Sequence, residues 1–577
     1  MRLPTPLLLA AALTSALVTV PPSVASTSPA PSSPRCDQPL QAAPRPAWRV
    51  EKAAPSNFAA AADANGTSTA GLAALAEDDT LWLDGCGMAF YREPALAGAA
   101  RSTERVATKA PAPPAGTDVL ALESHPGARR TIFIDVTGGT VTDTAWNTDL
   151  MREIGVAPYS LTNPADTAFT AAERTAIYRA WAVVAEDFAP FSVNVTTKDP
   201  GDGAIHRSSS ADLVYGSRVF LTQGNPLRSS CYCAGQSYVD AFGATGDDHA
   251  GHQPAWVFTD GIAEGNGDLI GDIVSHEVGH QLGLGHDGDG TSGYHWGNSL
   301  WGPVMGGSET KRLNQWSRGD YPGANNQEDD LAVIARNAPY RADSHGDTAA
   351  AATPLAGSAN GLIGKRSDVD AFSFTAAGAT ALTVRPTAER PNLDVKLTVL
   401  DSSGAKVAVV NPAPSELSSG AASGLDATWR TTLPDTPARY TALVDGAGHR
   451  TPATGGYTDY GSLGRYAISL RTLAGDAQVP VAVVKPPRFL TGSKLPGGRL
   501  RRAYIAKVKV TGDDTALTWR RRGPLPRGVR TTLSRNHKVM AISGRPRRTG
   551  RFEVRFVVRD DAGHRVARTF ILRVRRR

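Results

Sequence analysis

Three histidines and one glutamate lie in a twelve-residue stretch, HEVGHQLGLGHD, that begins at His276. His276 and His280 are four residues apart, so that on a helix both imidazoles face one side and can bind a single metal ion. Gly283 allows the helix to end and the chain to turn, which brings His286 to the same ion. Three protein ligands leave the fourth position of a tetrahedral site open, as a catalytic zinc requires. We therefore predict a zinc site formed by His276, His280 and His286.

Glu277 supplies the group that such a site needs for hydrolysis. Zinc lowers the pKa of a bound water toward about 7. A neighbouring carboxylate can accept a proton as the water attacks a carbonyl carbon and then pass it to the leaving group. A His-Glu-x-x-His match arises by chance in a chain of 577 residues with 12 histidines with a probability of roughly 1%. Gly283 and His286 make a coincidence rarer still, so structural histidines on an ordinary helix are the weaker alternative.

The elements around the motif must place it against a sheet. Val274, Val278 and Leu282 form an apolar stripe for the core, and Asp268 can cap the motif helix. An amphipathic helix is expected over 169–188, and the strands are expected at 131–136, 191–196, 213–222, 237–242 and 255–259. A helix, several strands and a second helix predict an α/β domain with a mixed sheet, for which we take the bounds 126–342.

The stretch from His276 to Asp287 resembles the zinc signature of the metzincin metallopeptidases, and the aspartate after the third histidine resembles the adamalysin/reprolysin branch. Met305, in the sequence PVMG, matches the family's Met-turn, which supports the metal site from below without binding the metal. The resemblance implies a metzincin-like catalytic domain with a mixed twisted sheet and an active-site helix. It also implies a zinc endopeptidase with Glu277 as general base and acid, in which strand 237–242 is an edge strand that pairs with an extended substrate.

The chain departs from some metzincins near the methionine. Astacins and serralysins have a tyrosine two residues after it, where this chain has Gly307, so the group that assists zinc stays unassigned. The specificity pocket is expected from loops after Met305, with 313–321 as a candidate. The acidic run 287–290 suggests calcium, but it lacks the later ligands of an EF-hand loop, and a plain turn is favoured. The motif alone does not exclude a non-peptide amide as substrate.

The first 25 residues have the pattern of a secretory signal peptide. Arg2 is basic, residues 7–20 are apolar but too few to span a bilayer comfortably, and small residues precede the expected cleavage site. No later run of about 18 apolar residues occurs, so we expect no transmembrane segment. The predicted location is secreted and extracellular, with association with the cell wall as an option.

Residues 26–125 are predicted to be either a removable pro-segment, as in a zymogen, or a permanent N-terminal module, with a hairpin over 79–93. Cys36 and Cys86 are expected to pair with each other, whereas Cys231 and Cys233 could close a small ring or pair elsewhere. A further hypothesis makes Cys36 a thiolate that blocks the metal, as in the cysteine switch of matrixins. It is disfavoured because Cys36 lies far upstream of the catalytic domain.

The remainder of the chain predicts two all-β sandwich domains, at 343–475 and 490–577, joined by a linker over 476–489. The first resembles bacterial pre-peptidase C-terminal domains in its DSHGDTAAAATPL and DVDAFSF patterns. Those modules sometimes hold calcium, and solvated turns are the alternative for the matching residues Asp343, Asp347, Asp368 and Asp370. The second resembles Ig-like domains of bacterial surface and secreted proteins.

Charge separates the last domain from the rest. Residues 481–577 carry 27 of the 61 basic residues and 5 of the 55 acids, a balance of +22 against −16 for the remainder. This basic unit can bind an anionic cell-surface polymer, or it can simply aid solubility. Nucleic acid is not expected as a partner of an exported chain without a stacking-aromatic motif. The leading hypothesis is a secreted zinc endopeptidase acting on protein or peptide substrates. The alternative is a surface- or polymer-binding protein with a degenerate peptidase domain.

Overall fold

The computed structural model describes Cys36 and residues 39–576, except for residues 96–111, 163–167, 224–225, 263–264, 291, 308–310, 388–389, 415–423, 474–486, 512–516, 535–537 and 560–564. The predicted signal peptide at 1–25 and most of the predicted linker at 476–489 lie outside the described residues. Among the helices of the described part, none combines the length and apolarity that crossing a bilayer requires.

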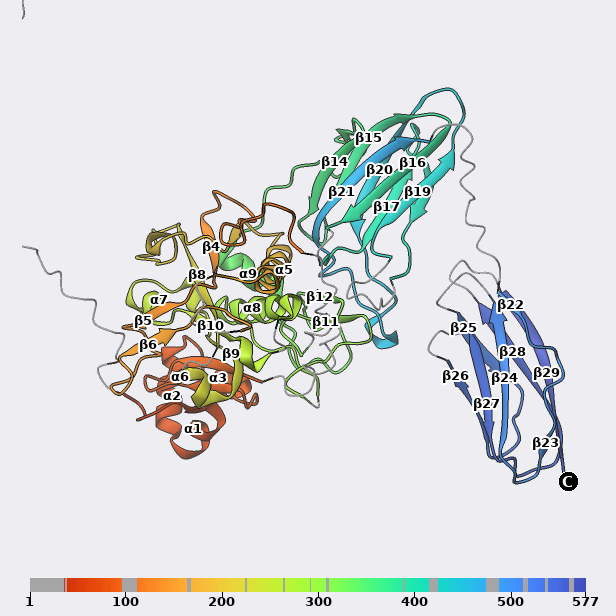
Figure 1. The fold of residues 1–577 in the computed structure, drawn as a ribbon, viewed down its shortest axis with the longest axis horizontal. Helices are drawn as coiled ribbons and strands as arrows, with labels where there is room; N and C mark the ends of the chain where they lie inside the picture. The colour runs from red at the N-terminus through yellow and green to blue at the C-terminus, as the bar shows by residue number, and fades with distance from the viewer. Residues whose placement is uncertain are drawn as a thin grey trace, which may run out of the picture.

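An eight-stranded mixed sheet organises the first part of the chain, in the order β1-β2-β3-β9-β10-β8-β4-β7 (Figure 1). Its strands are β1 (Arg45–Pro46), β2 (Leu81–Leu83), β3 (Ala89–Pro94), β4 (Arg130–Asp135), β7 (Val193–Thr196), β8 (Tyr215–Thr222), β9 (Cys233–Tyr238) and β10 (Ala255–Phe258). Strands β4, β7, β8 and β10 are parallel, and β9 runs antiparallel to β10. The predicted mixed sheet is present. Three strands from before residue 95 extend it, because β3 pairs antiparallel with β9.

The strand predicted at 237–242 is displaced. Strand β9 ends at Tyr238, because Asp240 adopts a left-handed backbone conformation with φ of 56° and residues Ala241–Gly243 form a 3-10 turn. Both edges of β9 are covered, one by β10 and the other by β3. The edge strand inferred from the family resemblance is therefore already paired.

Two long helices, α5 (Ala171–Asp187) and α8 (Gly267–Gln281), pack against each other, and α8 also contacts β9 and β10. Gly271 permits this close approach, because a Cβ added there would come within 2.6 Å of the Cβ of Val183. Asn266 caps the start of helix α8, and its side chain accepts a hydrogen bond from the Leu269 amide. The expected cap, Asp268, is wrong: its carboxylate pairs with Arg179 on α5 at 2.6 Å.

Shorter elements complete this part of the molecule. The helices are α1 (Ala47–Ala53), α2 (Pro55–Ala64), α3 (Thr69–Leu75), α6 (Pro226–Cys231), α7 (Asp247–Gly251) and α9 (Asp330–Asn337). Two small sheets pair β5 (Gly139–Thr142) with β6 (Glu153–Val156) and β11 (Trp301–Pro303) with β12 (Leu313–Gln315). Disulfides join Cys36 to Cys86 and Cys231 to Cys233. The first pairing is confirmed, the second is the small ring, and the thiolate hypothesis for Cys36 is wrong.

A β-sandwich follows, with sheets β13-β15-β20-β17-β18 and β14-β21-β16-β19. Its strands are β13 (Thr353–Pro354), β14 (Ser358–Ile363), β15 (Val369–Ala376), β16 (Ala379–Pro386), β17 (Val395–Leu400), β18 (Lys406–Val410), β19 (Ala427–Thr432), β20 (Ala438–Gly446) and β21 (Gly464–Thr472). One continuous apolar core runs from the first part of the chain into this sandwich, including Phe188, Trp316 and Leu393.

Buried ion pairs and hydrogen bonds tie the sandwich to helices α5 and α8. The Arg390 guanidinium contacts the Asp272 carboxylate at 2.9 Å, with 6% and 1% of these residues exposed. The Asn392 amide donates to the Asp187 carboxylate at 2.7 Å. Burial raises the pKa of Asp272 well above its ordinary value, although Arg390 opposes the shift. The sandwich therefore supplies the partners of acids that the helices bury.

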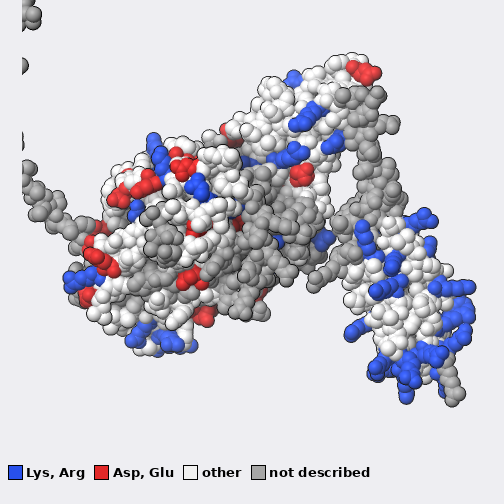
Figure 2. All heavy atoms as spheres, viewed as in Figure 1, with Lys and Arg blue, Asp and Glu red and all other residues white. Residues whose placement is uncertain are grey.

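The last unit is a second sandwich with its own apolar core and the sheets β22-β24-β27-β26 and β23-β29-β28-β25. Its strands are β22 (Arg488–Phe489), β23 (Gly498–Arg499), β24 (Tyr504–Thr511), β25 (Thr518–Arg522), β26 (Val529–Leu533), β27 (Val539–Gly544), β28 (Gly550–Arg559) and β29 (Arg565–Arg575). Along β24 buried residues alternate with exposed ones such as Lys507 and Lys509. Lysine and arginine side chains are scattered over the visible face of this unit and gather at its lower end and right edge (Figure 2).

Candidate metal centre

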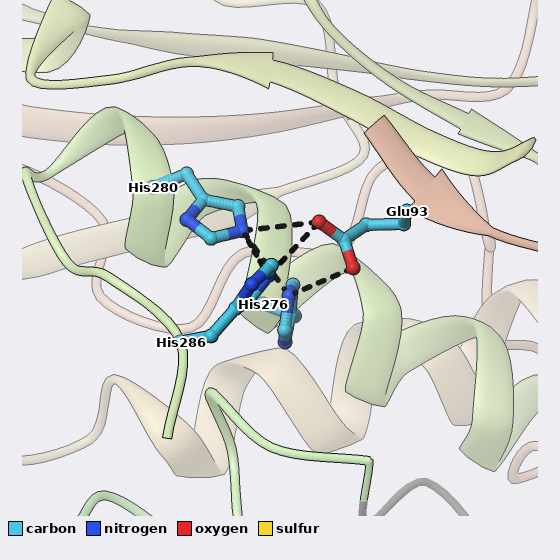
Figure 3. A group of neighbouring side chains, drawn as sticks. All are labelled: Glu93, His276, His280 and His286. Atoms are coloured by element: carbon cyan, nitrogen blue, oxygen red, sulfur yellow. Dashed lines mark hydrogen bonds and ion pairs between the residues drawn. The ribbon is translucent and has the colours of Figure 1, made fainter. Parts of the chain in front are cut away.

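The three predicted histidines converge. His276 and His280 lie on α8, and His286 follows the turn at Gly283, whose φ is +99°. The Nε2 atom of His280 lies 3.2 Å from that of His276 and 3.1 Å from that of His286 (Figure 3). All three residues are buried. The spacing of the motif thus brings its three imidazoles to one point, as expected.

The second nitrogen of each ring has an oxygen partner. The Nδ1 atoms lie 2.9 Å from the Val304 carbonyl for His276, 2.8 Å from the Leu284 carbonyl for His280 and 2.5 Å from the Asp78 carboxylate for His286. A carbonyl oxygen only accepts, so Nδ1 carries the proton in His276 and His280, and their Nε2 lone pairs point to the shared centre. This is the usual arrangement around metal-binding histidines.

These residues fit a zinc ion. Two unprotonated Nε2 atoms cannot form a hydrogen bond with each other, and a cation between them satisfies both lone pairs. Ligand atoms around a tetrahedral zinc with bonds of about 2.0–2.1 Å lie about 3.3–3.4 Å apart. The measured Nε2 separations of 3.1 and 3.2 Å are close to that value.

A fourth candidate ligand, Glu93, comes from β3 and was not anticipated from the sequence. One carboxylate oxygen lies 3.0 Å from Nε2 of His286 and 3.3 Å from Nε2 of His280, and the other lies 3.4 Å from Nε2 of His276. Glu93 is 6% exposed. The hydroxyl of Tyr294 donates a hydrogen bond of 2.6 Å to the same carboxylate. Figure 3 shows Glu93 facing the three rings.

The charges around the centre favour a cation. Burial by itself lowers the pKa of His286, but the Glu93 and Asp78 carboxylates outweigh it and raise that pKa to about 10. Burial lowers the pKa of His280 to about 4, against the opposing effect of Glu93. Burial raises the pKa of Glu93, yet the histidines reverse this and hold it well below its ordinary value. A carboxylate at this point is therefore ionised and stabilises positive charge among the rings.

Glu277 lies next to the histidines and is fully buried. Among the described residues, neither of its carboxylate oxygens has a hydrogen-bond partner. Burial raises its pKa well above the ordinary value, and the nearby Glu93 raises it further. Its side chain fits because residue 235 on β9 is glycine: a Cβ there would lie 2.6 Å from the Glu277 carboxyl carbon. A buried carboxylate without a partner costs folding free energy, which points to a chemical role.

Met305 is fully buried beneath the centre, where a Cβ on Gly279 of α8 would collide with its sulfur. The Met305 carbonyl accepts from the Asp287 amide at 2.7 Å, which ties the turn to the segment after His286. The position is the one expected for a Met-turn. A Cβ at Gly307 would lie 2.7 Å from the Trp296 ring, so a tyrosine at this position, as in astacins and serralysins, would clash with that ring.

An apolar pocket adjoins the histidines. Its wall includes Ala234, Ile273 and Trp296, and Pro94 of β3 also lines it. The segment 313–321, a candidate for the specificity pocket, does not line this pocket. Its residues 315–318 line a separate cavity together with residues of the sandwich. Trp316 is held there because it is buried and its indole NH donates to the Asp187 carbonyl at 2.8 Å.

The acidic positions considered for calcium behave differently from one another. Asp287 is buried and accepts from the Tyr321 hydroxyl at 3.3 Å. In the sandwich, Asp343, Asp347 and Asp368 come together, with one oxygen of each within 4.8 Å of the others. Asp370 is not part of that group, since its carboxylate accepts a hydrogen bond from the Tyr466 hydroxyl. Calcium binding by the remaining three aspartates stays a prediction.

Comparisons with known proteins identify no family for the whole chain. No family model and no curated protein matches it. Among solved structures, it is similar to the sialic acid binding region of a Streptococcus sanguinis adhesin, with 16% identity over 16% of this chain and 31% of that chain, at a TM-score of 0.15. It is also similar to the titin M3 domain, with 16% identity over 16% of this chain and 98% of that chain, at a TM-score of 0.13.

A third similar structure is the pre-peptidase C-terminal domain of a collagenase from Bacillus anthracis. The identity is 12% over 23% of this chain and 98% of that chain, at a TM-score of 0.14. None of the three therefore covers more than 23% of the protein.

Proposed function

We propose that this protein is a secreted zinc endopeptidase with a metzincin-like catalytic domain. The observation that carries the proposal is the convergence of the Nε2 atoms of His276 and His286 on that of His280, at 3.2 and 3.1 Å, beside the buried, unpartnered carboxylate of Glu277. When bound by His276, His280 and His286, zinc supplies Lewis-acid activation of water and of a peptide carbonyl. Two disulfides agree with an oxidising, extracellular location.

Glu277 is the general base and acid of this proposal. Its carboxylate accepts a proton from the attacking water and transfers it to the nitrogen of the leaving amine. Its burial suits this role, because a raised pKa makes the carboxylate a better proton acceptor near neutral pH. The same observation disfavours a degenerate peptidase domain, in which nothing would maintain an unpartnered buried acid.

Tyr294 is the residue that stabilises developing negative charge on the substrate carbonyl oxygen. Its hydroxyl already donates to the Glu93 carboxylate at the histidines, so it is aimed at the position of an anionic oxygen. It would replace the tyrosine for which Gly307 leaves no room. Strand β9 would bind an extended peptide substrate by antiparallel pairing.

The test of this function is hydrolysis of casein by the purified protein, measured for the intact chain and for a chain cleaved between residues 96 and 111. We expect activity that a zinc chelator abolishes and zinc restores. Glu277→Gln should keep its zinc and lose about 10²–10⁴ in rate. Full activity of Glu277→Gln, or a zinc-loaded cleaved chain that hydrolyses no peptide, would overturn the proposal. The latter result would favour the polymer-binding alternative.

The basic C-terminal unit is proposed to hold the enzyme on an anionic polymer such as a wall polymer or an acidic polysaccharide. Four cations, Lys494, Arg499, Arg573 and Arg575, line one hollow between β23 and β29. Electrostatic binding weakens with salt, so retention on a phosphate-bearing polymer column should fall steeply as the ionic strength rises. Retention that does not depend on salt would contradict this role.

A further inference from the structure

The N-terminal segment, defined here as Cys36 with residues 39–95, enters the metal centre of the same chain. We propose that it is an intramolecular inhibitor, in which Glu93 takes the fourth position at the three histidines and β3 fills the place of a substrate strand on β9. This inference rests on the proposed function and specifies its regulation. Under this proposal the N-terminal segment is a pro-segment and not an independent module.

The first support is the backbone pairing. Residues 90–94 of β3 run antiparallel to β9, with Glu93 opposite Gly235 and Pro94 opposite Cys233. A peptide substrate that pairs with β9 needs the same row of backbone NH and carbonyl groups. Pro94 also lines the apolar pocket beside His276. The segment and a substrate therefore exclude each other along the strand and at the adjoining pocket.

The second support is the way in which Glu93 meets the histidines. Its side-chain oxygens, rather than a main-chain carbonyl, lie 3.0–3.4 Å from the three Nε2 atoms. The segment therefore presents no peptide bond to Glu277 at the point of attack. The carboxylate also accepts the hydrogen bond that the Tyr294 hydroxyl would otherwise donate to a substrate oxygen. Glu93 therefore fills the position beside the three Nε2 atoms with a carboxylate, which is a common zinc ligand.

The third support is a set of further contacts from the same segment to the metal-binding rings. The Asp78 carboxylate binds Nδ1 of His286 at 2.5 Å. The Tyr91 ring stacks on His280, with centroids 4.1 Å apart, and lies 4.5 Å from the His286 ring. Two of the three histidines are thus also contacted by residues that precede the catalytic domain.

The covalent structure allows the segment to leave after one cut. Both Cys36 and Cys86 belong to the segment, and the other disulfide joins Cys231 to Cys233 within the catalytic part. All four cysteines are thereby used, so no disulfide ties the segment to the remainder. Hydrolysis by an endopeptidase of one peptide bond in residues 96–111 consumes one water and leaves a new carboxylate and a new amino terminus. After that step only non-covalent contacts hold Glu93 in place.

The test measures access to the metal without relying on peptidase activity. The full chain carries a recognition sequence for a site-specific protease between residues 96 and 111, and Co²⁺ replaces zinc so that ligand binding changes the visible spectrum. Acetohydroxamate is the probe. If the site is closed about 99% of the time, its apparent affinity in the intact chain is about 100-fold weaker than after cleavage and removal of the segment.

Glu93→Gln in the uncut chain tests the same point if the cleaved segment stays bound. We expect it to raise the affinity for acetohydroxamate toward that of the cleaved chain, because a neutral amide is a weaker ligand. The matched control is Asp63→Asn, which removes an exposed acid on α2 and should leave the affinity unchanged. Equal affinities in intact and cleaved protein, no binding to either form, or identical behaviour of the two variants would overturn the inference.

The outcomes separate this inference from the proposed function. A cleaved chain that binds acetohydroxamate much more tightly but hydrolyses no peptide supports the inference and refutes the peptidase. An intact chain that hydrolyses casein as fast as the cleaved chain supports the peptidase and refutes the inhibitor.

Discussion

The glycine at position 235 offers a sharp test of the geometry around Glu277. In Gly235→Ala the new Cβ would lie 2.6 Å from the Glu277 carboxyl carbon and 2.9 Å from the Trp256 carbonyl oxygen, whereas ordinary contact begins at 3.4 Å. The carbonyl is held in the pairing of β9 with β10, so the Glu277 side chain has to move. Its Oε1 atom would lie closer still, so the carboxyl group must retreat by more than about 0.8 Å, and displacements of about 1 Å in an active site cost about 10²-fold in rate.

We therefore expect kcat/KM of the cleaved Gly235→Ala protein to fall by about 10²-fold, which corresponds to about 2.7 kcal/mol of transition-state stabilisation. The three histidines are untouched, so zinc content should equal that of the parent. The matched control is Gly155→Ala, also on a strand, where a Cβ meets nothing within 4 Å. The assay is hydrolysis of a fluorogenic peptide, with zinc content and thermal midpoint measured on the same samples.

The result that refutes the reasoning is a Gly235→Ala protein as active as Gly155→Ala at equal zinc content. Glu277 would then act from a different position, or it would not be the base. A loss of zinc together with activity would show instead that the substitution disturbs α8 as a whole.

Three further predictions concern other parts of the structure. Tyr294→Phe should retain zinc and lose about 10²–10³ in kcat, as for a lost oxyanion donor, and a normal kcat would exclude that role. Arg390→Met leaves Asp272 buried without its charge partner and should lower the free energy of unfolding by about 3–5 kcal/mol in denaturant titrations. Adding Asp272→Asn should recover most of this loss, and no recovery would mean that the ion pair is not its cause. Burial raises the pKa of Asp394 to about 7, so the folded state binds that proton more tightly than the unfolded state. The contribution of this group to the free energy of unfolding is fully present below the unfolded pKa of 3.8 and is lost as the pH rises to about 7. In Asp394→Asn the thermal midpoint should therefore depend less on pH between these values than in the parent protein. An unchanged dependence on pH would contradict the assignment.

The positions of His276, His280 and His286 could be read from the sequence because their spacing is a local property of one helix and one turn. The helical repeat places residues four apart on one face, and the glycine at 283 supplies the backbone conformation that ends the helix. Met305 could be placed because the sequence around it resembles the Met-turn of metzincins. Asp268 could not be excluded as the cap, because its alternative partner, Arg179, lies on another helix.

The amino-acid sequence by itself determined the histidine triad, the adjoining Glu277 and the two sandwiches, since each follows from short-range periodicity or composition. The Cys36–Cys86 pairing was expected, and the tertiary structure settled it. Only the tertiary structure decided that β3 lies on β9, that Glu93 faces the three histidines and that the Tyr294 hydroxyl donates to its carboxylate. It also decided that Arg390 neutralises Asp272. These contacts join residues far apart in the chain, and no local pattern encodes them. They exist because the sheet brings distant strands side by side and because buried charges must find partners.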